Sequence, residues 1–293
     1  MAIILKNERV VLHVDLPEES YRQPRFDWTG KITRVTFEGT PVTGFELRKG
    51  ANEEYGQGFY NEFGIKTAIG FEEVDEGGWF HKIGVGLLQK QGPKYQFHVP
   101  HVTRPAAFEV KADDHQIGIT CRSEVHEGYA YELRKTIRLT EDGFDIDYRL
   151  DNVGKKAIVT EEYCHNFLAI DKKPMGADYQ LSFPFELMPD QFDETLNPKE
   201  VVRFAAQALS FNKKPKGAFF FSNLSGGKHV HAHWTLEQRE SRLGISETGN
   251  FQTSSINLWG MGHVISPELF ISINVAPGMS QSWTRAFDMF RMK

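Results

Sequence analysis

The chain has 293 residues, 40% of them hydrophobic and 25% charged, so it is long enough to bury a large core without disulfide staples. Its net charge of −5 at pH 7, with no long basic run, argues against nucleic acid and membrane surfaces as partners. Two cysteines, Cys121 and Cys164, give neither a disulfide framework nor the spacing of a zinc site. The start, MAIILKNERV, is too short in apolar residues for a signal peptide, and we expect a cytoplasmic protein.

Alternation of apolar and polar residues with a period of two dominates the chain. In FDIDYRL (144–150), Phe144, Ile146 and Tyr148 share one face and the charged residues share the other, which predicts a half-buried strand. Turn signals such as TEDGF (140–144) and DNVGKK (151–156) separate such segments. The same pattern predicts strands at 31–39, 116–123, 129–139, 157–163, 231–238 and 268–275.

Two regions depart from this pattern. Residues from about 50 to 105 are rich in glycine and aromatics, and we expect long functional loops over a scaffold there. The segment KEVVRFAAQAL (199–209) is the best candidate for a short helix. Many strands and few helices predict an all-β fold, a large sandwich of mainly antiparallel strands. No shift in composition marks a linker, so we expect one domain over 1–293.

A histidine lies in the apolar run EEYCHNFLAID (161–171). Neighbours in a strand point to opposite faces, so Cys164 and His165 cannot form a nucleophile–base pair. Cys164 is therefore expected to be a small packed residue. His165 shares its face with Glu161, Tyr163 and Phe167, a mixture of charge and aromatics typical of a sugar-binding surface. A hydrogen-bonded structural histidine fits that position equally well.

A second segment, ISPELFISINVAPGMSQSW (265–283), carries an acid. Leu269, Ile271 and Ile273 form an apolar strand face, and Glu268 lies on the opposite face. An acid and a base on the polar faces of one sandwich could meet across a cleft. A solvated charge at a strand edge is the alternative reading of Glu268.

Together these segments resemble the aldose 1-epimerase (galactose mutarotase-like) superfamily. That family places a histidine shortly before a Phe and a Leu on a central strand, as in CHNFLAI here. It places a glutamate on a late strand before an apolar run and a Pro-Gly turn, as in SPELF and VAPGMSQSW. The stretch 236–260 resembles, in its order of residue types, the segment that the family carries between this histidine and this glutamate. The resemblance covers roughly residues 25–290.

The opening YRQPRFDWTGKITRVTFEG (21–39), with YNEFGI (60–65) and FHKIGVG (80–86), looks like a bacterial branch of that superfamily. The family's Gly-Arg…Asn-Arg and His-Gly-Gly motifs are missing from this sequence. FHKIGVG stands in for the second motif, which would make His81 or Lys82 a sugar contact. An Asn precedes the catalytic His in the usual pattern; Cys164 takes that place here.

The resemblance implies a β-supersandwich and interconversion of sugar anomers by general acid–base catalysis, with no cofactor. The ring oxygen needs a proton while the anomeric hydroxyl loses one. A histidine with an ordinary pKa of about 6.5 suits the acid role, and an ionised glutamate suits the base role. We therefore expect His165 as general acid and Glu268 as general base.

Other residues are candidates for substrate binding. Arg25 and Glu62 could recognise sugar hydroxyls, with Lys82 or Arg285 beside them; for Arg25 the alternative is a surface ion pair. A flat aromatic platform suits the apolar face of a sugar ring. Candidate platforms are Trp28, Trp79, Trp259 and Phe167, each of which also fits the core.

The run KHVHAHW (228–234) puts His229, His231 and His233 on one strand face. No third ligand of suitable spacing lies nearby, so we expect no metal, and we take His233 as a residue lining the sugar cleft. Neither GIKTAIG (64–70) nor FHKIGVG has the spacing of a phosphate-binding loop, which argues against a nucleotide.

The expected partner is a monosaccharide or a sugar derivative, bound by a monomer or a homodimer. A non-catalytic carbohydrate-binding protein is one alternative. An enzyme acting on a phosphorylated or acidic sugar is another, with Arg25, Lys82 and Arg285 against the negative group. A lyase acting beside a uronate carboxylate is a third. The fold alone does not separate these functions.

Overall fold

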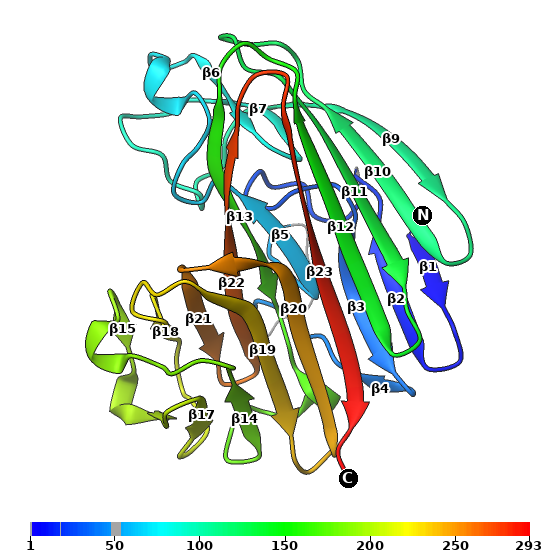
Figure 1. Ribbon diagram of the computed structural model, residues 1–293, viewed down its shortest axis with the longest axis vertical. Coiled ribbons are helices and arrows are strands. Elements are labelled where there is room, and N and C mark those ends of the chain that lie inside the picture. Colours follow the sequence, from blue (N-terminus) through cyan, green and yellow to red (C-terminus); the bar gives the residue numbers. More distant parts are fainter. Residues whose placement is uncertain (1, 18, 48–53) are drawn as a thin grey trace.

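Antiparallel pairing organises the computed structural model, which describes residues 2–17, 19–47 and 54–293 (Figure 1). Two large sheets of ten strands pack face to face, and a small sheet of three strands lies at one end (Figure 1). The helical segments of the described residues are four 3₁₀ turns, Phe71–Glu73, Ile170–Lys172, Pro189–Gln191 and Pro198–Glu200. Within those residues, no helix has the length and apolar character needed to cross a bilayer.

The first sheet carries most of the site residues. Its strands, in order across the sheet, are β1 (Ile3–Lys6), β2 (Val10–Asp15), β3 (Lys31–Phe37), β5 (Phe59–Phe63), β13 (Ile158–Asn166), β22 (Val264–Val275), β21 (Ile256–Met261), β18 (Phe219–Phe221) and β15 (Thr195–Leu196), with β4 (Thr40–Pro41) paired to β3. Strand β13 therefore lies near the middle, between β5 and β22.

The second sheet covers the inner face of the first. Its strands, in order, are β16 (Val202–Phe204), β17 (Ala208–Phe211), β14 (Tyr179–Ser182), β19 (Val230–Gln238), β20 (Leu243–Thr253), β23 (Ser280–Arg291), β12 (Gly143–Asn152), β11 (Tyr131–Leu139), β10 (Gln116–Arg122) and β9 (Ala107–Ala112). The small sheet consists of β6 (Trp79–Lys82), β7 (Gly86–Gln89) and β8 (Thr103–Pro105).

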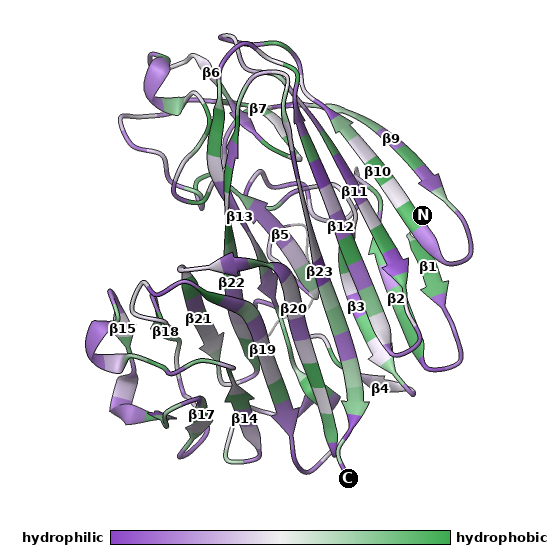
Figure 2. Cartoon of the chain, in the orientation of Figure 1, coloured by the Kyte–Doolittle hydropathy of each residue, from purple (hydrophilic) through white to green (hydrophobic). Residues whose placement is uncertain are grey.

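The predicted strands are confirmed. Each of the seven ranges predicted from alternation overlaps an observed strand, and in β12 the residues Phe144, Ile146 and Tyr148 are buried as expected. Hydrophilic and hydrophobic bands alternate along the long strands (Figure 2). The all-β antiparallel sandwich expected from the sequence is therefore the observed fold, because strands with one apolar face bury it by pairing sheets.

The predicted helix at 199–209 is wrong. The chain there forms the turn Pro198–Glu200 and then the antiparallel pair β16–β17. Val202 and Leu209 are buried in the core, on strands that extend the edge of the second sheet. Valine and phenylalanine at period-two spacing favour a pleated surface, and packing against the sheet outweighs the weak helical pattern.

The region from about 50 to 105 is more ordered than the sequence analysis expected. It contains β5, in the middle of the first sheet, and all of the small sheet. Residues 50–53 lie outside the described residues. One long connection remains within the small sheet, residues 90–102 between β7 and β8, and part of it lies near Arg25.

The core between the large sheets contains a buried ion group. Arg285 of β23 donates to Glu162 of β13 at 2.7 Å and to Glu247 of β20, and all three side chains are fully buried. Trp283 Nε1 and Asn61 Nδ2 also donate to Glu162. A buried charge is tolerated only when it is paired and hydrogen-bonded, so these contacts fix the relation of the two sheets at this point.

Replacement of Arg285 by Leu is therefore expected to lower the free energy of unfolding by about 3–5 kcal/mol, because two buried carboxylates lose their cation. Urea unfolding followed by tryptophan fluorescence measures this change. The matched control is Arg149→Leu on the neighbouring strand β12, whose side chain is half exposed beside Asp151 and whose loss should cost less than about 1 kcal/mol. Equal losses in the two variants would contradict a structural role for the buried ion group.

Candidate functional site

The site is built on the outer face of the first sheet, where β13 and β22 run antiparallel. The last ladder pair of these strands is Tyr163 with Phe270, so the next outward-facing residues along the two strands are His165 and Glu268. Their side chains meet: His165 Nε2 lies 3.4 Å from Glu268 Oε1. The structure therefore brings together the two residues that the sequence analysis expected to form an acid–base pair. Only 3% of His165 and 4% of Glu268 are exposed.

Aromatic rings enclose the imidazole. Phe167 stacks on it with ring centroids 4.0 Å apart and planes 11° from parallel. Trp259 of β21 meets it edge-on at 5.2 Å, and Phe26 meets it edge-on at 6.0 Å. Two of the candidate platforms, Trp259 and Phe167, thus lie against His165. This packing fixes the orientation of the ring, and it leaves His165 Nδ1 with no hydrogen-bond partner among the described residues.

Burial sets the protonation of the pair. It raises the pKa of Glu268 from its ordinary value to about 8, although the charge of Arg25 and a hydrogen bond from Ser266 act in the opposite direction. Burial, with the nearby charge of Arg25, also holds the pKa of His165 well below its ordinary value. At pH 7 the pair therefore holds one proton, on Glu268, beside a neutral imidazole. The sequence analysis expected the opposite arrangement at rest.

A charged cluster lies next to the pair. Glu62, fully buried on β5, accepts hydrogen bonds from Arg25 Nε at 3.1 Å and from the Tyr163 hydroxyl at 2.7 Å. Lys82 Nζ lies 3.4 Å from the other oxygen of Glu62 and donates to the Tyr95 hydroxyl at 3.0 Å. Three sequence-predicted residues, Arg25, Glu62 and Lys82, thus form one network on the His165 side of the sheet.

Arg25 links this network to a cavity. Its guanidinium is held by Glu46 at 3.1 Å as well as by Glu62, and it lies between the rings of Phe26 and Phe97. The cavity beside it has a volume of about 330 Å³, which is the size range of small-molecule sites. Its walls include both aromatic rings and polar groups. The lining residues are Tyr21, Gln23, Pro24, Arg25, Phe26, Glu46, Glu54, Tyr55, Phe97, His98, Val99 and Pro100.

Phe26 stands between the cavity and the pair. Its ring lines the cavity and also packs against His165. His165 and Glu268 themselves do not line this cavity. A ligand bound there would contact Phe26, whose ring packs against His165.

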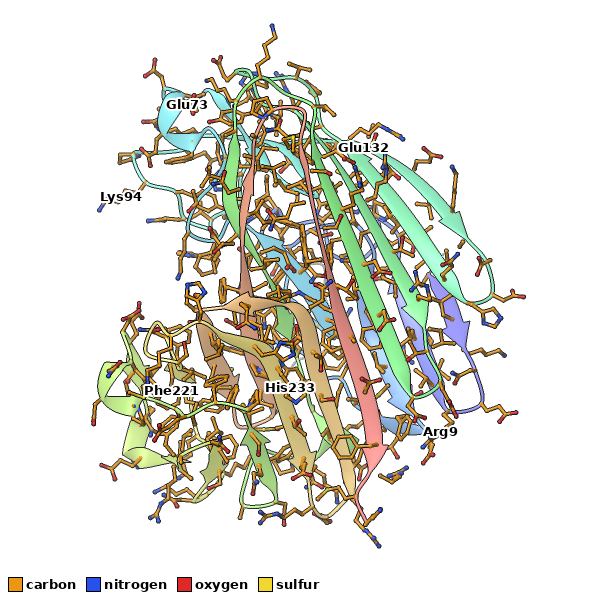
Figure 3. All side chains as sticks on the ribbon, viewed as in Figure 1. Arg9, Glu73, Lys94, Glu132, Phe221 and His233 are labelled. Carbon is orange, nitrogen blue, oxygen red and sulfur yellow. The ribbon has the colours of Figure 1, made fainter. Side chains whose placement is uncertain are left out.

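Three sequence-predicted residues lie elsewhere. Arg285 is in the core between the sheets, with its guanidinium taken by two carboxylates. His81 precedes Lys82 on β6 and therefore points the other way, where its Nε2 lies 3.3 Å from the carbonyl of His126. His233 lies on β19 of the second sheet (Figure 3), between the hydroxyls of Thr248 and Thr235. The structure does not bring any of these three to the cluster.

The position of Arg285 also excludes one anion site that the sequence suggested. In one alternative, a phosphorylated or acidic sugar meets Arg25, Lys82 and Arg285 together. Arg25 and Lys82 contact Glu62 on the outer side of the first sheet, whereas Arg285 projects from the second sheet into the core. The three cations therefore do not form one anion site.

Sequence reasoning missed several site residues. Alternation placed Tyr163 on the face of His165, but no role in the site was assigned to its hydroxyl. Ser266 lies two residues before Glu268, and the same alternation could have placed it on the face of Glu268. Glu46, Phe26, Phe97 and Tyr95 come from connections between strands, where no periodicity indicates which side chains turn toward the sheet.

The cysteines take no part in the cluster. Cys164 is fully buried on the inner face of β13, as expected, and burial raises its pKa well above the ordinary value. Cys121 is also a free, buried thiol. Among the described residues, no group of three or more His, Cys, Asp or Glu side chains is arranged to hold a metal ion.

Comparison with solved structures identifies the fold. The chain aligns over 99% of its length with 100% of a galactose mutarotase-like protein from Lactobacillus casei, at 12% identity and a TM-score of 0.60. It aligns over 100% of its length with 100% of a galactose mutarotase related enzyme from Lactobacillus acidophilus, at 10% identity and a TM-score of 0.59. An aldose epimerase homologue from C. elegans matches over 100% of this chain and 99% of its own, at 10% identity and a TM-score of 0.58. The sequence matches no protein-family model and no curated protein.

The raised pKa of Glu268 predicts a pH-dependent cost to stability. Below its ordinary value of 4.5 the carboxyl is protonated in the folded and the unfolded chain, so it costs nothing. Between 4.5 and about 8 the unfolded chain releases the proton while the folded chain keeps it, so stability falls as pH rises. Glu268→Gln removes this titration and should be more stable than wild type by about 1–3 kcal/mol at pH 8.

Urea unfolding of both proteins at pH 4, 6 and 8 measures the difference. The gain should shrink toward pH 4, where both wild-type states are protonated. Glu240→Gln is the control, because the Glu240 side chain is 58% exposed beside Lys173 and should give no pH-dependent gain. A gain for Glu268→Gln that is the same at all three pH values would contradict a pKa raised by burial.

Proposed function

Because the chain has the galactose mutarotase-like fold and that fold here joins His165 to Glu268, we propose that the protein interconverts the anomers of a monosaccharide. The single observation that carries this proposal is the buried contact of 3.4 Å between the imidazole and the carboxyl, beside a cavity with polar and aromatic walls. The solved structures of the same fold include proteins described as galactose mutarotase related or aldose epimerase homologues, which supports the same reaction class.

The proposed chemistry needs only the proton that the pair already holds. One group gives a proton to the ring oxygen as the bond between that oxygen and the anomeric carbon breaks. The other group takes the proton of the anomeric hydroxyl, and a carbonyl forms. After rotation about the bond between the first two carbons, the transfers run backwards and the ring closes on the other face. No proton is gained or lost overall, and no cofactor enters the balance.

The resting protonation assigns the first transfers. Glu268 holds the proton, so it gives that proton to the ring oxygen, and neutral His165 accepts the proton of the anomeric hydroxyl. This assignment reverses the roles that the resemblance implied. Both groups serve once as acid and once as base in a complete exchange, so the same two residues are required in either case.

The cluster around Arg25 supplies substrate binding in this proposal. Arg25 presents donors to the cavity while Glu46 and Glu62 hold its position. Glu62 and Lys82 are buried and act through Arg25 and Tyr163, and Trp259 and Phe167 give His165 an apolar surround that suits the C–H face of a sugar ring. A cavity of about 330 Å³ fits a single sugar ring better than an oligosaccharide.

A non-catalytic carbohydrate-binding protein is the second candidate. The observation that favours it is the burial of the pair, since the ring of Phe26 lies between the cavity and His165. In that case the sugar would stay in the cavity and the pair would have a structural role. Sugar binding without catalysed anomer exchange distinguishes this candidate from the enzyme.

The test is anomer exchange followed by NMR magnetisation transfer on a panel of neutral, acidic and phosphorylated aldoses. Wild type should accelerate exchange of at least one sugar. His165→Ala and Glu268→Gln should each lower the catalysed rate by about 10²–10⁴-fold, because each removes one positioned acid–base group.

His231→Ala is the control, because His231 is exposed on the outer face of the second sheet and should leave the rate unchanged. Binding of a sugar with no acceleration by wild type would overturn the enzyme and favour the binding protein. Acceleration that survives in both site variants would show that another part of the chain catalyses the exchange.

A further inference from the structure

Strand β22 carries a proline in a place where strands rarely do. Pro267 lies inside β22, which pairs with β13 on one side and β21 on the other. Proline has no backbone N–H and cannot donate to a sheet ladder. The regular pairs between β13 and β22 run from Ile158 with Val275 to Tyr163 with Phe270 and do not extend to His165 and Glu268. The ladder thus stops two residues before the candidate catalytic pair, and backbone pairing resumes beyond it at Leu168 with Ile265.

Two side chains replace the missing ladder bonds. The Asn166 amide donates to the carbonyl of Pro267 at 2.6 Å. The backbone N–H of Asn166 donates to the Ser266 hydroxyl at 3.0 Å. Both residues are fully buried, so neither contact competes with solvent. Together they join β13 to β22 at the position of the pair.

Ser266 also contacts the pair directly. Its hydroxyl donates to Glu268 Oε1 at 3.2 Å, the same oxygen that faces His165 Nε2. One hydroxyl therefore accepts from the residue after His165 and donates to Glu268. The hydroxyl thus links β13 to the Glu268 side chain of β22.

Residues of the core hold Asn166 in place from the inner face of the first sheet. The Asn166 amide donates to Glu247 at 3.0 Å, and Glu247 in turn accepts from Arg285 and from Trp234 Nε1. The buried ion group between the sheets thus fixes Asn166. Arg285, which the sequence analysis took for a substrate contact, is therefore connected to the site through Glu247 and Asn166.

We propose that Ser266 is a positioning residue, whose hydroxyl, with the Asn166 amide, replaces the strand pairing that Pro267 interrupts and holds Glu268 in register with His165. This inference rests on the proposed function, in which His165 and Glu268 do the chemistry. Ser266 touches neither the cavity nor a substrate position. Its effect on the reaction is exerted through the orientation of Glu268.

The surroundings of Glu268 determine how the loss of the hydroxyl will appear. The charges of Arg25, Glu62 and Glu46 act on Glu268 from the β5 side, and His165 faces it from β13. The Ser266 hydrogen bond favours the ionised carboxylate. Ser266→Ala should therefore raise the pKa of Glu268, since none of the other groups changes.

The experiment compares wild type with Ser266→Ala, Ser266→Thr and Ser272→Ala. The Glu268 carboxyl is titrated by NMR in protein labelled with ¹³C at glutamate, with the signal assigned from Glu268→Gln. Ser266→Ala should shift the midpoint to higher pH, and Ser266→Thr, which keeps the hydroxyl, should restore it. Ser272 is exposed on the same strand, and Ser272→Ala should titrate as wild type.

Kinetics on an accepted sugar give the second readout. Ser266→Ala should lower kcat by about tenfold with KM within about twofold, because geometry at the reacting groups changes while the cavity does not. The alkaline limb of its pH–rate profile should move with the NMR midpoint. Thermal unfolding of the variants confirms that each is folded.

The two outcomes are separable. If wild type accelerates no anomer exchange, the proposed function fails, while the NMR titration still reports whether Ser266 acts on Glu268. If Ser266→Ala titrates as wild type, the positioning role is overturned, whether or not the protein catalyses anomer exchange. Failure of Ser266→Thr to restore the midpoint, in a folded protein, would also overturn it.

Discussion

Arg285 shares its charge with Glu162 and Glu247 between the two large sheets, and none of the three side chains reaches solvent. Each residue comes from a different strand, β23, β13 and β20, so the contacts tie the middle of one sheet to the middle of the other. Apolar side chains would pack this space with less electrostatic cost, but they would tolerate small shifts of one sheet over the other. Hydrogen bonds of fixed direction do not tolerate such shifts. The position of the site on the outer face of the first sheet is therefore fixed relative to the second sheet.

Strand β13 connects the core to the site because both of its faces are buried from Glu162 to Asn166. Its inner face gives Glu162 and Asn166 to the core network, and its outer face gives Tyr163 and His165 to the cluster. Because side chains alternate along a strand, a slip of one residue would exchange the two faces, so the core contacts and the site contacts of β13 require the same register. The position of His165 is therefore set by contacts on the far side of the sheet.

Alternation also explains what the sequence could predict. It located the strands, separated Cys164 from His165 and placed Glu268 opposite an apolar face, all from local pattern. The meeting of His165 with Glu268 came from resemblance, because no local pattern states which strands become neighbours. The error over Arg285 has the same origin: it occurs at an inward position of β23, and it was taken for a substrate contact because its buried partners come from other strands.

The candidate site is where the chain departs most from ordinary construction. A proline interrupts a central strand, a carboxyl is buried with its pKa raised to about 8, and His165 Nδ1 and Asn166 Oδ1 have no hydrogen-bond partner among the described residues. Each feature costs stability. Departures of this kind are typical of functional sites, and here they surround His165 and Glu268. The same burial that makes Glu268 costly to the fold raises its pKa to about 8 and favours its protonated form at neutral pH, beside an imidazole whose pKa burial lowers.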